Sequence, residues 1–480
     1  MLEGLQPQNV FTYFEELTHI PHGSGNTKAI SDYCVSFAKE HNLKYYQDEV
    51  NNVIIVKEAS AGREQDAGVI LQGHLDMVAV KDADSDHDFM KDPLPLAIHN
   101  DWITSTKTSL GGDDGIAVAY ALAILADDNI SHPHLEVILT VDEETGMEGA
   151  SAIDLSMITG KYLLNLDSEE EGIILTSCAG GLRGDMKLPV QYVQADGIAY
   201  TVTVKGLNGG HSGAEIHKER GNAIKLAGRM LYLLNDSFEI GVCGIKGGEK
   251  DNAIPRECSV ELMVSEAEAQ EMEQLLIDME ETFRKEFAVS DSGLQIEITK
   301  KGTCTQKVLT PMAQEKMIFL LMNVPNGVQH MSMDIEGLVE TSLNCGVVSM
   351  NDEVFELTAS LRSSVKSRKY ALSMQLKYLT EFLGGDYSIY GDYPEWEYKR
   401  DSKLREAAVA VYEEMFGKKP EIQAIHAGLE CGLLLEKCPD LDVISFGPDM
   451  KDIHTPKEAL SISSTKKMWD YLIAILEKIS

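Results

Sequence analysis

Residues 68–76 read Gly-Val-Ile-Leu-Gln-Gly-His-Leu-Asp, an apolar run that passes directly into polar side chains. The run predicts a buried strand over residues 68–71. Similar apolar runs occur at residues 53–56, 135–141 and 162–166, and helical spacing of apolar residues occurs between them at 28–40 and 116–126. Strands buried on both faces and separated by helices are typical of an α/β sheet that helices cover on both sides.

The pattern changes beyond about residue 185 and returns near the end of the chain. Strands that alternate polar and apolar residues are predicted at 199–205, 257–264, 294–299 and 355–362, with long amphipathic helices at 266–287 and 366–383. The C-terminal part again has the first pattern, with helices at 402–416, 427–435 and 464–478 and a strand at 443–446. Since 480 residues are too many for one core, we predict a discontinuous α/β domain, residues 1–182 and 393–480, with an α+β domain, residues 183–392, inserted.

The composition is that of an ordinary globular protein with a strong acidic excess. There are 77 acidic and 42 basic residues, which give a formal charge of −35. This charge disfavours nucleic acid and anionic membrane surfaces as partners. The N-terminal segment has no secretory signal pattern, no apolar run reaches bilayer length, and the eight cysteines are scattered without a Cys-x-x-Cys pair. We therefore expect a reduced, cytoplasmic compartment.

Five short segments place side chains that can bind metals at the ends of predicted strands or in nearby loops. They are Gly-His-Leu-Asp at 73–76, Gly-Gly-Asp-Asp-Gly at 111–115, Asp-Glu-Glu at 142–144, Leu-Asp-Ser-Glu at 166–169 and Ile-His-Thr-Pro at 453–456. In the first segment, His74 and Asp76 are two residues apart on an extended chain and therefore face the same side. Asp76 can accept the second ring N–H of a ligating histidine.

Four of the five segments also have an ordinary structural explanation when each is taken alone. His74 and His454 could be hydrogen-bonded structural histidines, residues 113–114 could cap the following helix, and residues 142–144 could form a solvated acidic turn. Together they favour a metal site, because ligands in an open α/β sheet collect beyond the carboxyl ends of the strands. Two histidines and several carboxylates suit zinc, manganese or cobalt, and they suffice for two ions that share one carboxylate, as in metal-assisted hydrolysis.

These segments resemble the co-catalytic zinc peptidases, the family that includes glutamate carboxypeptidase, peptidase T and carnosinase. The likeness to one dipeptidase subgroup of that family runs along nearly the whole chain. It includes Gly-Gly-His-Ser-Gly at 209–213, Asn-Ala-Ile-Pro-Arg-Glu at 252–257, Glu-Thr-Ser-Leu-Asn at 340–344, Leu-Arg-Ser-Ser at 361–364 and His-Ala-Gly-Leu-Glu-Cys-Gly at 426–432. The resemblance implies a three-layer α/β/α catalytic domain of the zinc-peptidase type, discontinuous, with an inserted α+β lid or dimerisation domain.

The resemblance also implies a role for each site residue. Two Zn²⁺ ions per chain, with Mn²⁺ or Co²⁺ as possible substitutes, are expected on the ligands His74, Asp113, Glu144, Asp167 and His454. Asp113 is expected between the two ions, with His74 and Asp167 at one and Glu144 and His454 at the other. Glu143 is expected to be the general base for a metal-bridged hydroxide, and Asp76 to orient His74. His211 is expected to bind the substrate carbonyl, and the expected further substrate contacts are Asn252, Arg362 and His426.

The implied reaction is the hydrolysis of small, unblocked dipeptides, with Xaa-His types such as β-alanyl-histidine preferred, by a cytoplasmic homodimer. Three alternatives stay open at this point. The chain could be an N-acyl amino acid deacylase or a tripeptide aminopeptidase with the same chemistry, or an inactive binding scaffold on a peptidase fold. It could also be a calcium protein, although His74 and His454 argue against calcium, which prefers oxygen ligands.

Overall fold

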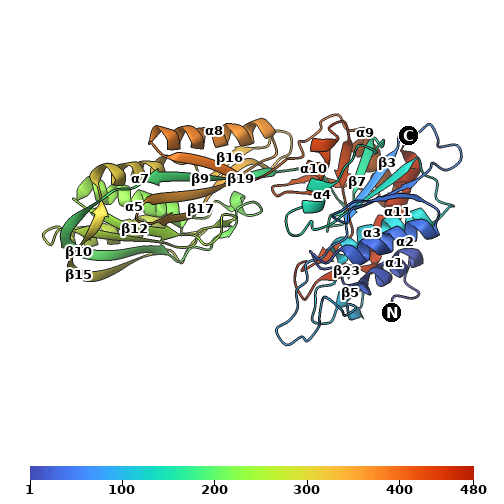
Figure 1. Ribbon diagram of the computed structural model, residues 1–480, viewed down its shortest axis with the longest axis horizontal. Coiled ribbons are helices and arrows are strands. Elements are labelled where there is room, and N and C mark those ends of the chain that lie inside the picture. The colour runs from blue at the N-terminus through green and yellow to red at the C-terminus, as the bar shows by residue number, and fades with distance from the viewer. Residues whose placement is uncertain (480) are drawn as a thin grey trace. The chain divides into compact units, whose positions relative to one another are not determined.

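The computed structural model describes residues 1–479, which divide into two compact units (Figure 1). Unit 1 comprises Met1–Ser177, Tyr398–Ala424 and the chain from Leu429 onward. Unit 2 comprises Cys178–Glu397 and Ile425–Gly428. The unit boundaries thus lie about five residues outside the predicted insertion of 183–392. In addition, the short segment around His426 belongs to unit 2 and not to unit 1.

Unit 1 is built on a mixed sheet with the strand order β1-β2-β6-β3-β7-β21-β8-β20. Strand β3 pairs in parallel with β6 and β7, and β7 pairs in parallel with β21, so the centre of the sheet is parallel. The strands are β1 (Lys44–Gln47), β2 (Val53–Lys57), β3 (Val69–His74), β6 (Leu135–Thr140), β7 (Tyr162–Asn165), β8 (Ile173–Cys178), β20 (Glu421–Ile425) and β21 (Asp442–Ser445).

Helices cover both faces of this sheet. They are α1 (Gln8–Thr18), α2 (Lys28–Glu40), α3 (Gly112–Ala126), α4 (Glu148–Ala152), α9 (Lys403–Phe416), α10 (Glu430–Lys437) and α11 (Ile462–Lys478). Val69, Leu71 and Val137 share one apolar core with α1, α2, α3, α9 and α11. Gln72 and Thr140 lie on the opposite face, where they contact Glu430 of α10. Figure 1 shows α4 and α10 on that side of the sheet, and the result is the predicted three-layer α/β/α architecture.

Helix α3 is apolar on all sides after its first turn, and almost every residue of it is buried. A helix of this kind belongs in the interior of a protein. The ammonium group of Lys57, on β2, closes its carboxyl end by donating to the carbonyl oxygens of Ile124, Leu125 and Asp127 at 3.4, 3.0 and 3.0 Å. Lys57 therefore stabilises the carboxyl end of α3, which is the end opposite to Asp113.

A smaller antiparallel sheet with the order β22-β23-β5-β4 completes unit 1. Its strands are β4 (Leu96–His99), β5 (Trp102–Ser105), β22 (Met450–Lys451) and β23 (Ala459–Ser461). The loop between β22 and β23 carries His454. Pairing of β23 with β5 joins this C-terminal loop to the segment that leads into α3.

Unit 2 is a long antiparallel sheet with helices, as predicted for an α+β segment. Its strand order is β15-β10-β14-β12-β17-β18-β9-β19, and β16 pairs with β17. The strands are β9 (Gly180–Pro189), β10 (Tyr192–Lys205), β12 (Gly241–Gly247), β14 (Cys258–Val264), β15 (Gln295–Leu309), β16 (Gly327–Met331), β17 (Val339–Met350), β18 (Val354–Ser363) and β19 (Asp386–Tyr393). Its helices are η1 (Ile216–Lys218), α5 (Ala223–Ser237), α6 (Ala269–Glu286), α7 (Pro311–Asn323) and α8 (Lys366–Phe382), and the short strands β11 (Gly210–His211) and β13 (Ala253–Ile254) form a separate ribbon.

The helix predicted at residues 427–435 differs from the structure, in which α10 begins only at Glu430. The preceding residues are not helical: the chain bends at residues 426–427, where the backbone N–H of Ala179 donates to the carbonyl oxygens of Ile425 and Ala427 at 3.1 and 3.0 Å. These tertiary hydrogen bonds override the local helical pattern. Within residues 1–479, each helix is either too short or too polar to cross a bilayer.

Candidate metal centre

The five predicted ligands meet at the carboxyl edge of the parallel strands in unit 1. They comprise His74 at the end of β3, Asp113 in the first turn of α3, Glu144 after β6, Asp167 after β7 and His454 between β22 and β23. Each parallel strand delivers its last residues to the same edge of the sheet. Segments far apart in sequence therefore supply one cluster of side chains.

The carboxylate of Asp113 lies between two imidazoles. Nε2 of His74 is 3.1 Å from Oδ1 of Asp113, and Nε2 of His454 is 3.1 Å from Oδ2. Burial opposes ionisation of Asp113, but the hydrogen bonds to the two histidines outweigh it and hold its pKa well below the ordinary range. One carboxylate thus presents one oxygen to each of two histidine nitrogens.

A further carboxylate accompanies each histidine. Nε2 of His74 is 3.7 Å from Oδ1 of Asp167, and Nε2 of His454 is 2.8 Å from Oε1 of Glu144. Two overlapping groups have donor atoms within 4.8 Å of one another and could hold a metal ion: His74, Asp113 and Glu144, and His74, Asp114 and Asp167.

These residues fit divalent cations by spacing and by chemistry. Ligands about 2.0–2.1 Å from a tetrahedral zinc lie about 3.3 Å from each other, and the spacings here run from 2.8 to 3.7 Å. Burial raises the pKa of Asp167 and Asp114 well above the ordinary range. Within residues 1–479, Oδ1 of Asp114 is buried and has no hydrogen-bond partner. Such crowded carboxylates are more stable beside a cation.

Asp76 contacts three segments of the site, namely His74, the backbone of residues 143–144 and Ser24. Nδ1 of His74 lies 3.0 Å from the main-chain oxygen of Asp76 and 3.5 Å from its carboxylate, so the closer partner is the backbone and not the predicted side chain. The Asp76 carboxylate accepts hydrogen bonds from the backbone N–H groups of Glu143 and Glu144 at 3.0 and 3.4 Å. It also accepts one at 2.8 Å from the hydroxyl of Ser24.

Glu143 lies beside the ligand groups without belonging to either of them. Burial and the neighbouring carboxylates, Glu144 first, raise its pKa to about 7, against the opposing influence of His74. A carboxyl with a pKa near neutrality can both accept and release a proton under ordinary conditions. This is the property that a general base requires.

A network of buried polar side chains lies next to the site, on the last residues of the central strands and on α10. Oε2 of Glu430 accepts hydrogen bonds from Nε2 of Gln72 and Oγ1 of Thr140, both at 2.6 Å. The side-chain amide of Asn165 donates to Gln72 at 2.6 Å. Glu430 is completely buried, and burial, with Glu143 as a lesser cause, raises its pKa to about 8. The sequence gives no spacing signal for this network.

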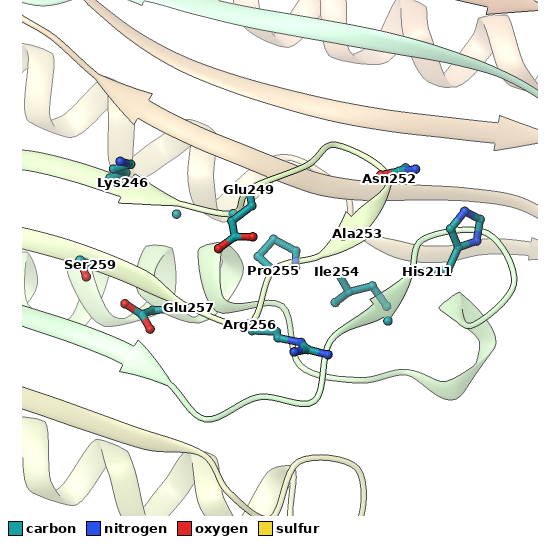
Figure 2. A pocket seen from close by; sticks show the side chains of 13 residues that line it. His211, Lys246, Glu249, Asn252, Ala253, Ile254, Pro255, Arg256, Glu257 and Ser259 are labelled. Carbon is teal, nitrogen blue, oxygen red and sulfur yellow. The ribbon is translucent and has the colours of Figure 1, made fainter. Parts of the chain in front are cut away.

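The other predicted substrate contacts lie in unit 2. Nδ1 of His211 accepts hydrogen bonds from the backbone of Gly213 and Ala214 at 3.2 and 3.0 Å, so a neutral ring carries its proton on Nε2. Burial, and to a lesser extent Arg362, lowers the pKa of His211 and favours that neutral ring. His211 and Asn252 both line a cavity of about 760 Å³ (Figure 2).

Arg362 and His426 lie next to His211 in unit 2. A side chain at Gly213 would come within 3.1 Å of both the Arg362 Nε and the His211 ring, and within 2.5 Å of the His426 carbonyl, so only glycine fits there. The ring of His426 is 2.7 Å from the Ser342 hydroxyl, and burial lowers its pKa to about 3. These contacts bring together three of the four predicted substrate residues of this unit.

An open α/β sheet with histidines and carboxylates gathered at its carboxyl edge defines a metallohydrolase. The chain belongs to the peptidase family M20/M25/M40, whose model matches residues 70–478. It is therefore a metallopeptidase, a hydrolase that acts on peptide bonds, and the predicted family and fold are confirmed.

Individual relatives match over the full length. The cytosol non-specific dipeptidase of Escherichia coli (strain K12) is 38% identical over 481 residues, which cover 100% of this chain and 99% of that protein. The crystal structure of aminoacylhistidine dipeptidase from Vibrio alginolyticus superposes with a TM-score of 0.95 and 37% identity, over 100% of this chain and 98% of that one. Aminopeptidase PepT from Bacillus cereus shares the fold, with a TM-score of 0.57 and 15% identity over 99% of both chains.

Proposed function

We propose that this protein is a metal-dependent dipeptidase that cleaves unblocked dipeptides. The observation that carries the proposal is the Asp113 carboxylate, which presents one oxygen to His74 and the other to His454. Support also comes from the full-length similarity to a protein named cytosol non-specific dipeptidase. That name supports a cytoplasmic location for this chain as well.

Two divalent cations, Zn²⁺ in the first instance, would be held by the residues around Asp113. His74 and Asp167 would hold one ion, Glu144 and His454 the other, and Asp113 would contact both. When bound, such ions polarise a carbonyl group and lower the pKa of water. The donor set, two imidazoles and carboxylates, suits Zn²⁺, Mn²⁺ and Co²⁺.

Glu143 is the proposed general base. Its carboxylate takes a proton from the water that attacks the scissile carbonyl carbon, and the protonated Glu143 then transfers that proton to the leaving amine nitrogen as the C–N bond breaks. Asp76 is the positioning residue for this step, because it holds the backbone of Glu143. It also accepts from Glu144, so both glutamates keep a fixed spacing.

Unit 2 is proposed to bind the dipeptide. The Nε2 proton of His211 is suited to donate to the carbonyl oxygen, a contact worth about 3–4 kcal/mol when it forms in the transition state. Arg362 and Ser212 are buried, and within residues 1–479 the Arg362 Nε and Ser212 Oγ have no hydrogen-bond partner. Both atoms can donate to the free carboxylate of a dipeptide, together with Asn252 and His426.

A preference for Xaa-His dipeptides, such as β-alanyl-histidine, is proposed from the similarity to a protein named aminoacylhistidine dipeptidase.

We also propose a homodimer formed through unit 2. The apolar side chains of Met374, Tyr378 and Phe382 stand four residues apart along α8 and are 67, 74 and 75% exposed, and Met312 on α7 is 67% exposed. Apolar groups gathered in this way on a surface are typical of a protein interface.

A metal titration combined with one substitution tests the dipeptidase proposal. Chelated protein should be inactive toward Ala-His and recover with two equivalents of Zn²⁺, Mn²⁺ or Co²⁺. Glu143→Gln should bind the same two equivalents and lose at least about a thousandfold in kcat, because an amide cannot carry the proton. Near-normal turnover of this variant would contradict the role of Glu143.

Substrate competition tests the peptide class. Specificity constants for Ala-His, β-Ala-His, Ala-Leu, Ala-Ala-His and N-acetyl-His are compared under one metal condition. Preferential cleavage of N-acetyl-His or of the tripeptide would overturn the dipeptidase proposal. Equal rates on Ala-Leu and Ala-His would remove only the preference for histidine.

A further inference from the structure

Glu458 is a buried carboxylate, 3% exposed, that follows His454 by four residues. Its Oε2 accepts hydrogen bonds from the backbone N–H groups of Leu110 and Gly111 at 2.8 and 3.2 Å. Its Oε1 accepts from Gly112 and Asp113 at 2.8 and 3.3 Å. The Glu458 side chain therefore accepts hydrogen bonds from four successive backbone amides, which lie about 345 residues earlier in the sequence.

These four amides include the first turn of α3, where N–H groups have no partner within the helix. A negative charge at this end of a helix is favourable, and here it comes from a distant loop rather than from the residue before the helix. The residue before α3 is Gly111, which has a φ of 68° and no side chain to cap the helix. Glu458 thus supplies the cap that the local sequence lacks.

The loop that carries His454 needs support of this kind. Asp452 and His454 both have left-handed backbone conformations, with φ of 49° and 60°. This conformation costs roughly 1–2 kcal/mol for a residue other than glycine. Glu458 closes the loop, since its own N–H donates to the Thr455 carbonyl while its carboxylate is fixed to the segment of Asp113.

We infer that Glu458 is the positioning residue that joins the His454 loop to the Asp113 turn, and thereby sets the spacing at which both residues meet a metal ion. The inference rests on the proposed metal centre. Glu458 contacts the backbone of one proposed ligand and lies on the loop of another, but it is not itself a ligand. Loss of such supporting contacts typically weakens metal affinity about 10- to 100-fold.

Mn²⁺ binding to chelated, full-length protein tests this inference without relying on turnover. Glu458→Gln retains the shape of the side chain, but its amide group must face two N–H donors, so at least two of the four hydrogen bonds are lost. We expect the dissociation constant of at least one Mn²⁺ equivalent to rise tenfold or more. We also expect the electron paramagnetic resonance signal of a coupled Mn²⁺ pair to diminish, because the two ions no longer share a fixed carboxylate.

Glu136→Gln is the matched control. Glu136 is also a buried carboxylate, and it accepts backbone hydrogen bonds from Thr159 and Gly160 at 2.8 and 2.9 Å, but it lies at the opposite end of β6. This variant should lose thermal stability and keep both Mn²⁺ affinities. Equal weakening of Mn²⁺ binding in both variants would mean a general effect of stability and would overturn the inference.

Gly112→Ala tests the same contact without removing the charge. A methyl group there would lie 3.3 Å from Oε1 of Glu458 and 3.3 Å from the sulfur of Met450, so it presses on the carboxylate. We expect weaker Mn²⁺ binding in the same direction, and this variant decides the question if Glu458→Gln does not fold. Affinities within twofold of the wild type in folded variants would overturn the inference. A wild-type protein that fails to bind two Mn²⁺ ions would contradict the proposed metal centre itself.

Discussion

The buried carboxyl of Glu430 makes the stability of unit 1 depend on pH in a way that Glu430→Gln should abolish. Burial, with Glu143 as a lesser cause, raises the pKa of Glu430 to about 8, from 4.5 for an exposed glutamate. The folded protein therefore favours the protonated acid. Its contribution to stability is fully present below about pH 4.5 and is lost as the pH rises through about 8.

The size of the effect follows from the shift. One pKa unit corresponds to about 1.4 kcal/mol, so a shift of about 3.5 units makes the free energy of unfolding fall by about 4–5 kcal/mol between pH 4.5 and pH 9. Glutamine keeps an oxygen that can accept from Gln72 and Thr140, but it does not titrate. At about 2 °C per kcal/mol for a unit of this size, the unfolding temperature of the variant relative to wild type should rise by about 8–10 °C from pH 5 to pH 9.

Differential scanning calorimetry of chelated proteins at a series of pH values measures this difference. Metal-free protein is required, because bound cations would lower the pKa of a nearby carboxyl group. Asp114 and Asp167 titrate in both proteins, so most of their effect cancels in the comparison, and only the minor contribution of Glu430 to the raised pKa of Asp114 differs. The amide does not titrate, so its own effect on stability is the same at every pH, and only the change with pH is diagnostic. A difference that stays constant from pH 5 to pH 9 would refute the assignment of a neutral acid.

Three other predictions concern separate parts of the molecule. Lys57→Met leaves three carbonyl groups at the end of α3 without their ammonium partner. Calorimetry should show that the free energy of unfolding falls by about 1–3 kcal/mol, while kcat at low temperature stays unchanged. His211→Ala should lower kcat for Ala-His about 100- to 1000-fold with little change in KM, and a large rise in KM alone would contradict a role in the transition state. Phe382→Asp, on the exposed face of α8, should shift sedimentation from dimer to monomer, whereas an unchanged coefficient would place the interface elsewhere.

The position of the ligand candidates could be predicted because it depends on local pattern and on one topological rule. Apolar runs mark the central strands, and each run passes directly into a polar segment, as in residues 68–76. Parallel strands then bring those segments to one edge of the sheet. The structure brings His74 and Asp167 together in this way, at the ends of the parallel strands β3 and β7, and α2 begins and ends at the predicted residues 28–40.

The supporting contacts could not be predicted, because each joins segments that are distant in sequence and has no periodic signal. Ser24 reaches Asp76 across 52 residues, and Glu430 reaches Thr140 across 290. In unit 2, the sequence pattern also predicts a strand that is shorter than the one in the structure. The predicted strand at 294–299 continues to Leu309 in β15, where exposed polar residues hide the alternation, and pairing with β10 holds the extension in place.

Charge balance gives an independent reason to expect two cations in unit 1. The carboxyl groups of Asp113, Asp114, Glu143, Glu144 and Asp167 crowd around two imidazoles. The ionised forms of Asp113, Asp114, Glu143 and Asp167 are favoured chiefly by His74 and His454. A ligating histidine is neutral, so in the metal-bound state these rings would no longer offset the carboxylates. Two divalent ions bring four positive charges, enough to ionise most of the cluster. Metal binding should therefore release protons, and calorimetric titration in buffers of different ionisation enthalpy should measure more than one proton released per chain at pH 7.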